Sequence, residues 1–394
     1  MDDLDKRIDG ILPDVVEWRH DLHAHPELAF EEKRTSAFIA ERLTSFGLDV
    51  HTGLAGTGVV GVLRIGEGPS IGMRADIDAL PIVEATGLPY ASKHAGRMHA
   101  CGHDGHTAML LGAARVLAET KPKNGTFVFI FQPAEESEGG ARVMVEQGLF
   151  ARFPVDAVYG AHNWPGLPCG HFAVHAGPVM AAFDTFEVII EGKGSHGAMP
   201  HQGVDPITIG AQLQMAWQTI VSRAVSPTDA AVISVTQIHA GDTWNVIPDK
   251  LLLRGTVRSF DPQVRNLLEA KMAQRAVKIC GAFDATCRFT YTRRYPTTIN
   301  SAAEAETARR AATIAAGRER VVTDRPPSMG AEDFAFMLEQ RPGAYIWIGN
   351  GPDADGRNLH SPHYDFNDAA LPHGMRYWVR LAETACAEAV GVAA

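Results

Sequence analysis

The segment TFVFIFQPAEE, residues 126–136, carries a run of bulky apolar residues directly into two adjacent carboxylates. A short apolar run of this kind is typical of a strand buried on both faces. Similar runs occur nearby, with helical periodicity between some of them. The runs are 58–65, 70–75 and 157–161, and the helical patterns lie near 4–45, 105–119 and 139–147. Strands that alternate with helices predict an α/β sheet, in which ligands bind at the carboxyl ends of the strands.

A different order of elements begins after about residue 180. Its predicted elements are strand 183–190, helix 205–224, strands 231–239 and 251–259, helix 262–280 and strand 284–291. This β-α-β-β-α-β order describes a compact ferredoxin-like unit. Helical patterns at 304–316 and 370–389 and a strand-like run at 344–348 follow it. We therefore interpret the small unit as an insertion into a larger domain that resumes near residue 295.

The bulk composition limits the possible functions. A chain of 394 residues is too long for one ordinary core and favours two domains. The net charge of -10, with no Lys/Arg run, argues against nucleic acid or anionic membrane as partners. The acidic, helix-patterned N-terminus does not resemble a signal peptide, so we expect a cytoplasmic protein. Five scattered cysteines do not form a disulfide framework.

The segment MHACGHDGH, residues 98–106, gathers a thiol, imidazoles and a carboxylate where a helix is predicted to begin. Cys101 and His103 are its candidate metal ligands. A helix N-terminus also lowers the pKa of a nearby thiol. The alternative interpretation is a glycine-rich turn with a helix cap.

Glu135 and Glu136 follow a predicted strand, and successive side chains of extended backbone point in opposite directions. One glutamate could therefore bind metal while the other faces the substrate, although a solvated acidic turn is the alternative. His162 lies at another predicted strand end and His360 lies in a loop. Together the four segments provide a thiol, a carboxylate and imidazoles, a set that suits a borderline-soft divalent ion.

The ordered motifs resemble those of the M20 metallopeptidases. The similarity is to the amidohydrolase branch, which contains hippurate hydrolases, N-acyl-amino-acid amidohydrolases and auxin-conjugate hydrolases. The matching segments are HDLHAHPEL (20–28), RADIDALP (74–81), CGHD (101–104), QPAEE (132–136), GSHG (194–197), MGAEDF (329–334) and HSP (360–362). The resemblance implies a large catalytic domain with a central mixed sheet flanked by helices. An α+β ferredoxin-like lid/dimerisation domain would be inserted in it, with boundaries at 1–180, 181–294 and 295–394.

The resemblance also implies two divalent metal ions per subunit, with manganese, zinc, cobalt and nickel all open. Cys101 would bridge the ions, His103 and His162 would complete one site, and Glu136 and His360 would complete the other. Glu135 would be the general base, and Asp78 would orient the site. In this chain Asp76 and Cys101 stand where the wider family has a histidine and a bridging aspartate.

Three further residues are candidates through the same resemblance. His196 would stabilise the oxyanion from the partner subunit, which requires a homodimer or a higher homo-oligomer. Asn245 and Arg258 would bind the oxyanion or the substrate carboxylate, and their alternatives are a loop amide and a solvated arginine at a strand end.

The expected activity is hydrolysis of the amide bond of N-acyl amino acids, either hippurate-like aromatic or acetyl conjugates, by metal-activated water. A dipeptidase or a carbamoyl-amide hydrolase of the same family is the alternative. Two readings come from other classes: a metal-binding homologue without catalysis, and a cysteine hydrolase with Cys101 as nucleophile. The second of these gives no task to Glu136, His162 or His360.

Overall fold

The computed structural model describes residues 3–122, 124–136, 138–352 and 358–389, and the packing of Cα atoms divides it into two compact units. The large unit comprises the described parts of 1–179, 299–326 and 333–394. The small unit comprises Met180–Thr298 and Pro327–Glu332. Strands β7 (Gly177–Met180) and β14 (Thr298–Asn300) carry the chain from one unit to the other.

The large unit is built on an eight-stranded mixed sheet in the order β1-β2-β4-β3-β5-β16-β6-β15. The strands are β1 (Asp49–Leu54), β2 (Gly58–Arg64), β3 (Ser70–Asp76), β4 (Thr126–Gln132), β5 (Ala157–Pro165), β6 (Phe172–Ala173), β15 (Val321–Val322) and β16 (Gly343–Gly351). The central strands β4, β3, β5 and β16 are parallel to one another. Nearly every residue of β4 and β16 is buried, as expected for strands covered on both faces.

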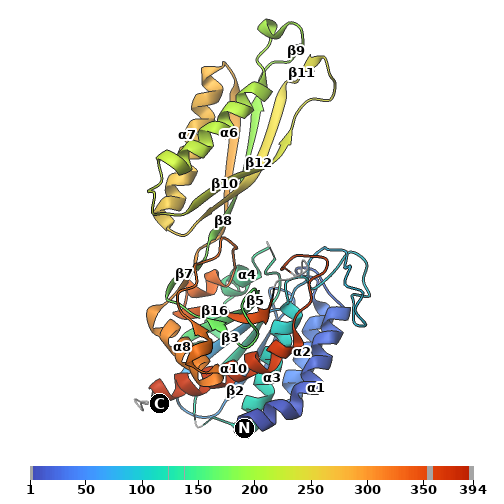
Figure 1. Ribbon diagram of the computed structural model, residues 1–394, viewed down its shortest axis with the longest axis vertical. Coiled ribbons are helices and arrows are strands. Elements are labelled where there is room, and N and C mark those ends of the chain that lie inside the picture. Colours follow the sequence, from blue (N-terminus) through green and yellow to red (C-terminus); the bar gives the residue numbers. More distant parts are fainter. Residues whose placement is uncertain (1–2, 123, 137, 353–357, 390–394) are drawn as a thin grey trace. The chain divides into compact units, whose positions relative to one another are not determined.

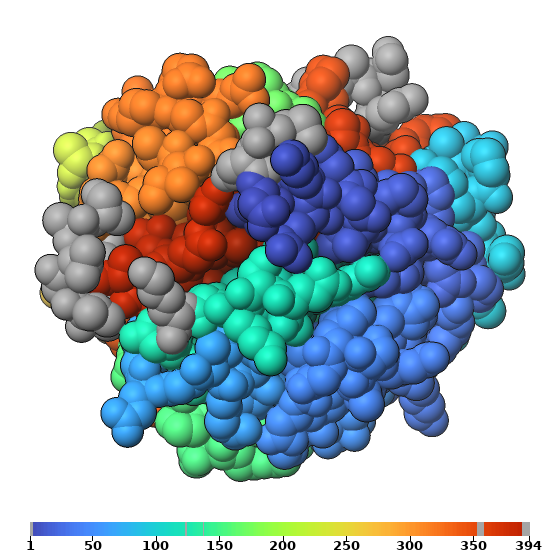
Figure 2. Space-filling model, turned by 90° about the horizontal axis from the view of Figure 1, so that it is seen from below, coloured from blue at the N-terminus to red at the C-terminus, as the bar shows by residue number. Residues whose placement is uncertain are grey.

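Helices cover this sheet and contribute most of the remaining core. They are α1 (Asp3–Ala24), α2 (Lys33–Ser45), α3 (His103–Thr120), α4 (Gly140–Glu146), α5 (Leu149–Arg152), α8 (Ala302–Ala316), α9 (Ala335–Leu338) and α10 (Leu371–Ala389), with short 3₁₀ turns at Arg318–Arg320 and Asp368–Ala370. The N-terminal helix α1 packs against both α3 and the C-terminal helix α10 (Figure 2). Within the described residues, none of the helices combines the length and the apolar character needed to cross a membrane.

The small unit is a four-stranded antiparallel sheet with two helices on one face (Figure 1). Its elements are β8 (Ala182–Glu191), α6 (Pro206–Arg223), β10 (Ala231–His239), β12 (Lys250–Ser259), α7 (Pro262–Ala282) and β13 (Thr286–Tyr295), in the sheet order β10-β12-β8-β13. Burial alternates along β8, and its inward residues pack with Trp217 of α6. Asp205 and Asp261 cap the two helices, each followed by a proline at the first helical position.

A short ribbon extends the small unit. It consists of β9 (Ser195–His196) and β11 (Val246–Ile247), which pair antiparallel, and the 3₁₀ turn Pro200–Gln202 follows β9. The α/β fold class with a mixed central sheet and a separate antiparallel sheet is thus confirmed. The domain boundaries at 180 and 294 stay a prediction.

Candidate metal centre

The five candidate metal ligands lie in four segments of the large unit. Asp76 and Gln132 are the last residues of β3 and β4, so Glu135 and Glu136 follow a carboxyl end of the sheet. His162 lies in β5, and Cys101 lies two residues before His103, the first residue of helix α3. The sequence pattern therefore placed these side chains at the edge where α/β sheets bind ligands.

The ligand atoms form two groups that share Cys101. One group contains Cys101, His103 and His162, and the other contains Cys101, Glu136 and His360. Within each group the ligand atoms lie within 4.8 Å of one another. The Cys101 Sγ lies 3.4 Å from Nε2 of His162, and the His360 Nε2 lies 3.3 Å from Oε1 of Glu136. The structure thus brings all five residues together, with Cys101 common to both groups.

Hydrogen bonds orient two of the imidazoles for metal binding. Nδ1 of His103 lies 2.9 Å from the backbone oxygen of Asp78 and 3.2 Å from its Oδ1. Nδ1 of His162 lies 2.6 Å from the backbone oxygen of Asn163. Because these partners are acceptors, Nδ1 carries a proton in each ring, which leaves Nε2 as the ring nitrogen available to a metal ion.

Asp78 connects the two ligand groups. Its Oδ1 lies next to His103, and its Oδ2 accepts a hydrogen bond of 3.0 Å from the backbone N–H of Glu136. One buried carboxylate therefore fixes the ring of one ligand and the main chain of another. This geometry supports the orienting role proposed for Asp78.

The backbone around the two glutamates corrects one expectation. They do not continue the strand in extended conformation, because β4 ends at Gln132 and Ala134 adopts a left-handed φ of 56°. The chain turns there, and the carboxylates of Glu135 and Glu136 both lie within 4.8 Å of His103. Alternation along a strand therefore does not separate their roles. His360 also has a positive φ, of 66°. A positive φ is uncommon for residues other than glycine, and such strained backbone clusters at functional sites.

The charge balance of the site fits divalent cations. Burial, together with the negative charges of Glu136 and Glu135, raises the pKa of the Cys101 thiol well above its usual value. Although burial lowers it, nearby carboxylates led by Asp76 raise the pKa of His103 to about 10. Carboxylates contribute to both shifts in the direction expected where negative charge gathers. Nε2 of His103 and Oε1 of Glu136 are also buried and have no hydrogen-bond partner among the described residues, as expected of atoms that bind metal.

A buried polar network behind the ligands was not predicted from the sequence. Arg74 donates to Asp76 at 2.7 Å, and Oδ1 of Asp76 lies 2.6 Å from Nδ1 of His106. Nε2 of His106 accepts from the backbone N–H of Asn163, whose side chain donates to the backbone oxygen of Cys101. The network thus supports the main chain at Cys101 and next to His162. The only sign of this network in the sequence was the presence of charged residues in the otherwise apolar segment 70–76.

The other three candidates belong to the small unit. His196 in β9 is directly opposite Val246, and the N–H of Gly197 donates to the backbone oxygen of Asn245 at 2.7 Å. His196 and Asn245 therefore share one end of the small unit. Arg258 lies on β12 with its guanidinium 4.2 Å from the ring of Phe183, and burial lowers its pKa. The roles of these three residues stay predictions.

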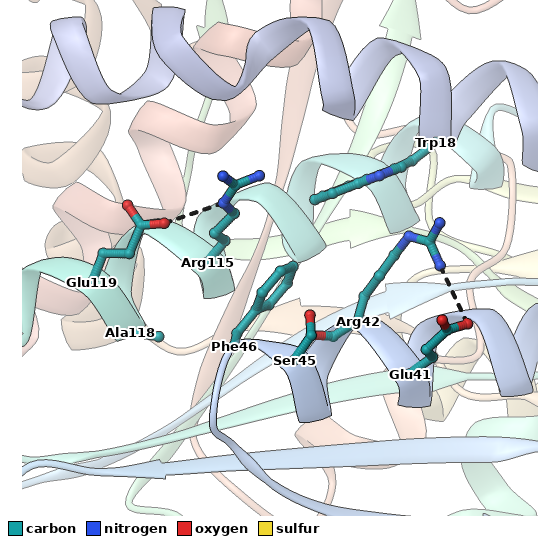
Figure 3. Close-up of a pocket in the computed structure, with 8 residues that line it drawn as sticks. All are labelled: Trp18, Glu41, Arg42, Ser45, Phe46, Arg115, Ala118 and Glu119. Atoms are coloured by element: carbon teal, nitrogen blue, oxygen red, sulfur yellow. Dashed lines mark hydrogen bonds and ion pairs between the residues drawn. The ribbon is translucent and has the colours of Figure 1, made fainter.

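A cavity of about 580 Å³ between α1, α2 and α3 contains none of the candidate ligands (Figure 3). Trp18 and Phe46 form its apolar wall. The charged groups of its rim face each other, with Arg115 bonded to Glu119 and Arg42 3.9 Å from Glu41. This cavity therefore offers a ligand an apolar wall and charged groups that lie beside opposite charges, and it lacks the converging metal-ligating side chains found at the carboxyl ends of the strands.

Convergent ligands beside a further carboxylate are the arrangement expected of a metal-dependent hydrolase. The family described as Peptidase family M20/M25/M40 matches residues 72–384. The N-acetyl-L-cysteine deacetylase of Bacillus subtilis is 44% identical over 93% of this chain and 85% of its own length. The hippurate hydrolase of Campylobacter jejuni is 40% identical over 92% of this chain and 94% of its own.

A solved structure from Bacillus subtilis gives the same result. It is described as a dinuclear metal-binding peptidase of the M20 family, and it matches with a TM-score of 0.82 and 35% identity over 95% of this chain and 98% of its own. This chain belongs to the M20 peptidase family, in its amidohydrolase branch, and is a metallo-amidohydrolase.

Proposed function

We propose that this protein hydrolyses the amide bond of N-acyl amino acids, with aromatic hippurate-like or acetyl conjugates as substrates. The observation that carries the proposal is the pair of ligand groups that share Cys101, with Glu135 beside Glu136 and His103. The names of two similar proteins, a deacetylase of N-acetylcysteine and a hippurate hydrolase, support this substrate class.

The five ligands would hold two divalent ions per subunit. Bound there, the ions would polarise the amide carbonyl and lower the pKa of water toward about 7. Glu135 takes the proton from the attacking water and passes it to the leaving nitrogen. A carboxylate that binds metal has committed its lone pairs, so the adjacent Glu136 cannot share this task. Asp78 keeps His103 and Glu136 in place during the reaction.

The small unit supplies the groups that recognise the substrate in this proposal. His196 of a second subunit stabilises the oxyanion, which makes a homodimer the active form. Asn245 and Arg258 bind the oxyanion or the substrate carboxylate. His196 and Asn245 are joined through the backbone bond at Gly197, so both can reach a substrate from one ribbon.

A thiol nucleophile is the competing mechanism. Nucleophilic cysteines have a lowered pKa and sit in electropositive surroundings. Burial and the neighbouring glutamates raise the pKa of Cys101 instead. This surrounding negative charge disfavours a free thiolate nucleophile, and the carboxylate and imidazoles that converge with Cys101 are the ligands a divalent ion would need.

A hydrolysis screen tests the proposal. Metal-depleted protein is reconstituted with manganese, zinc, cobalt or nickel and supplied with benzoyl-, acetyl- and indoleacetyl-amino acids. Dipeptides and N-carbamoyl amino acids are included as the family alternatives. We expect at least one N-acyl series to be hydrolysed, with loss of activity in EDTA. Activity that survives EDTA would support a thiol nucleophile, and turnover of only dipeptides or carbamoyl compounds would overturn the substrate class.

A further inference from the structure

We propose that Glu32 is a positioning residue that holds the turn carrying Glu135, the general base. The inference rests on the proposed function, because it assigns Glu32 a role through that base. Glu32 lies over a hundred positions from the turn in sequence. The sequence motifs gave no role to this residue.

Glu32 is fully buried, and both of its carboxylate oxygens are bonded. Oε1 accepts a hydrogen bond of 2.9 Å from the backbone N–H of Ala134, the residue directly before Glu135. Oε2 accepts a hydrogen bond of 2.6 Å from the hydroxyl of Thr57. The hydroxyl thus fixes the carboxylate, and the carboxylate fixes the main chain of the turn.

The other side of Glu135 is held in the same way. The backbone N–H of Glu136 donates to Asp78, so the amides on both sides of Glu135 end on buried carboxylates. The two carboxylates come from distant segments, which lets them define the position of the turn relative to the sheet. Glu135 is the residue between the two fixed points.

The turn needs such support because its conformation is unfavourable. Ala134 has a φ of 56°, in the left-handed region that is sterically unfavourable for an alanine. Its backbone oxygen accepts from Gly140, where an added Cβ would lie 1.8 Å from the backbone oxygen of Pro133. Strained backbone persists only where its surroundings determine it, and Glu32 provides one of those constraints.

Glu32 does not cap the helix that it precedes. It occupies the N-cap position of α2, but its side chain makes no cap hydrogen bond. Glu27 instead accepts from the backbone N–H groups of Arg34 and Thr35 in the first turn of that helix. The carboxylate of Glu32 therefore binds the turn and not its own helix. Glu27 is a nearby carboxylate that also accepts hydrogen bonds from backbone amides, so its substitution is a matched control.

The experiment compares Glu32→Ala, Glu32→Gln and Glu27→Ala in the metal-loaded protein with an N-acyl amino acid as substrate. Four quantities are measured: kcat, KM, bound metal per chain and hydrogen exchange of the backbone amides of residues 134–136. For Glu32→Ala we expect kcat to fall about 10- to 100-fold, as for a small displacement of a catalytic group. KM and bound metal should stay near their wild-type values, and exchange at Ala134 should accelerate. Glu32→Gln, which keeps an acceptor oxygen, should restore most of kcat.

The control fixes the interpretation. Glu27→Ala should lower stability and leave kcat within about twofold, since capping bonds of this kind contribute to helix stability only. Should Glu32→Ala not fold, Thr57→Val weakens the same hold and should lower kcat severalfold without loss of metal. A wild-type kcat in a variant whose turn exchanges faster would overturn the inference, as would parallel loss of metal and activity. Full activity of Glu135→Gln would instead overturn the proposed base, and the exchange result would still report on the turn.

Discussion

Among the described residues, the large unit buries more charged side chains than the small unit does. The large unit encloses charged residues at the carboxyl ends of strands that are covered on both faces, and Arg74, Asp76 and Asp78 are almost completely buried there. The small unit has a sheet with alternating burial, and its ion pairs such as Arg254 with Glu187 are mostly exposed. Buried charge is costly and is kept where fixed dipoles and shifted pKa values serve chemistry. We therefore expect the metal centre and the base in the large unit, whereas the residues proposed to contact the oxyanion and the substrate carboxylate belong to the small unit.

The largest expected effect comes from breaking the buried network. Arg74→Met leaves Asp76 and Asp333 buried without their guanidinium partner. The free energy of unfolding should fall by about 3–5 kcal/mol, as when one partner of a buried ion pair is removed. Arg254→Met in the small unit removes an exposed pair and should cost below about 1 kcal/mol. Denaturant titration of both variants measures the contrast, and equal losses would contradict it.

A core truncation in the small unit should separate stability from chemistry. Leu213 is fully buried against the small-unit sheet, so Leu213→Ala should cost about 2–5 kcal/mol. Bound metal per folded chain should not change, because every candidate ligand belongs to the large unit. Elemental analysis of the folded fraction checks this. If bound metal fell in proportion to the lost stability, the assignment of metal binding to the large unit alone would be wrong.

A smaller effect should follow from loosening the ligands without removing them. Asp78→Asn keeps the shape of the side chain but weakens its hold on His103 and on the N–H of Glu136. Metal affinity should fall about 10- to 100-fold, as for other residues that orient ligands. Competition with a chelator of known affinity provides the measurement. Unchanged affinity would mean that packing alone orients His103.

A pH dependence of stability isolates one buried carboxyl group of the large unit. Burial, with a contribution from Asp78, raises the pKa of Glu32 to about 7. The folded state therefore binds this proton more tightly than the unfolded state does, and Glu32 lowers stability as pH rises from about 4.5 to 7. Glu32→Gln cannot titrate, so its free energy of unfolding relative to wild type should rise across that interval. A flat difference would contradict the shift.

The long periodic elements could be predicted from the sequence, and the short or distant features could not. The six principal elements of the small unit and strands β2 to β5 follow from local apolar patterns. The two-residue strands β6 and β15 carry no pattern of their own, because pairing with distant strands creates them. The five ligands came from motifs, whereas the bond from Ala134 to Glu32 joins residues that no local pattern connects. The left-handed turn at Ala134 was missed because alanine gives no signal for it.

The central claim is that Glu135 is a base acting beside a metal centre formed by other residues. The direct measurement is kcat and bound metal for Glu135→Gln with an N-acyl amino acid that the wild-type protein hydrolyses. We predict two metal ions per chain and a kcat lower by about 10²- to 10⁴-fold, the usual contribution of general acid–base catalysis. Near-normal turnover with both ions bound would contradict the account.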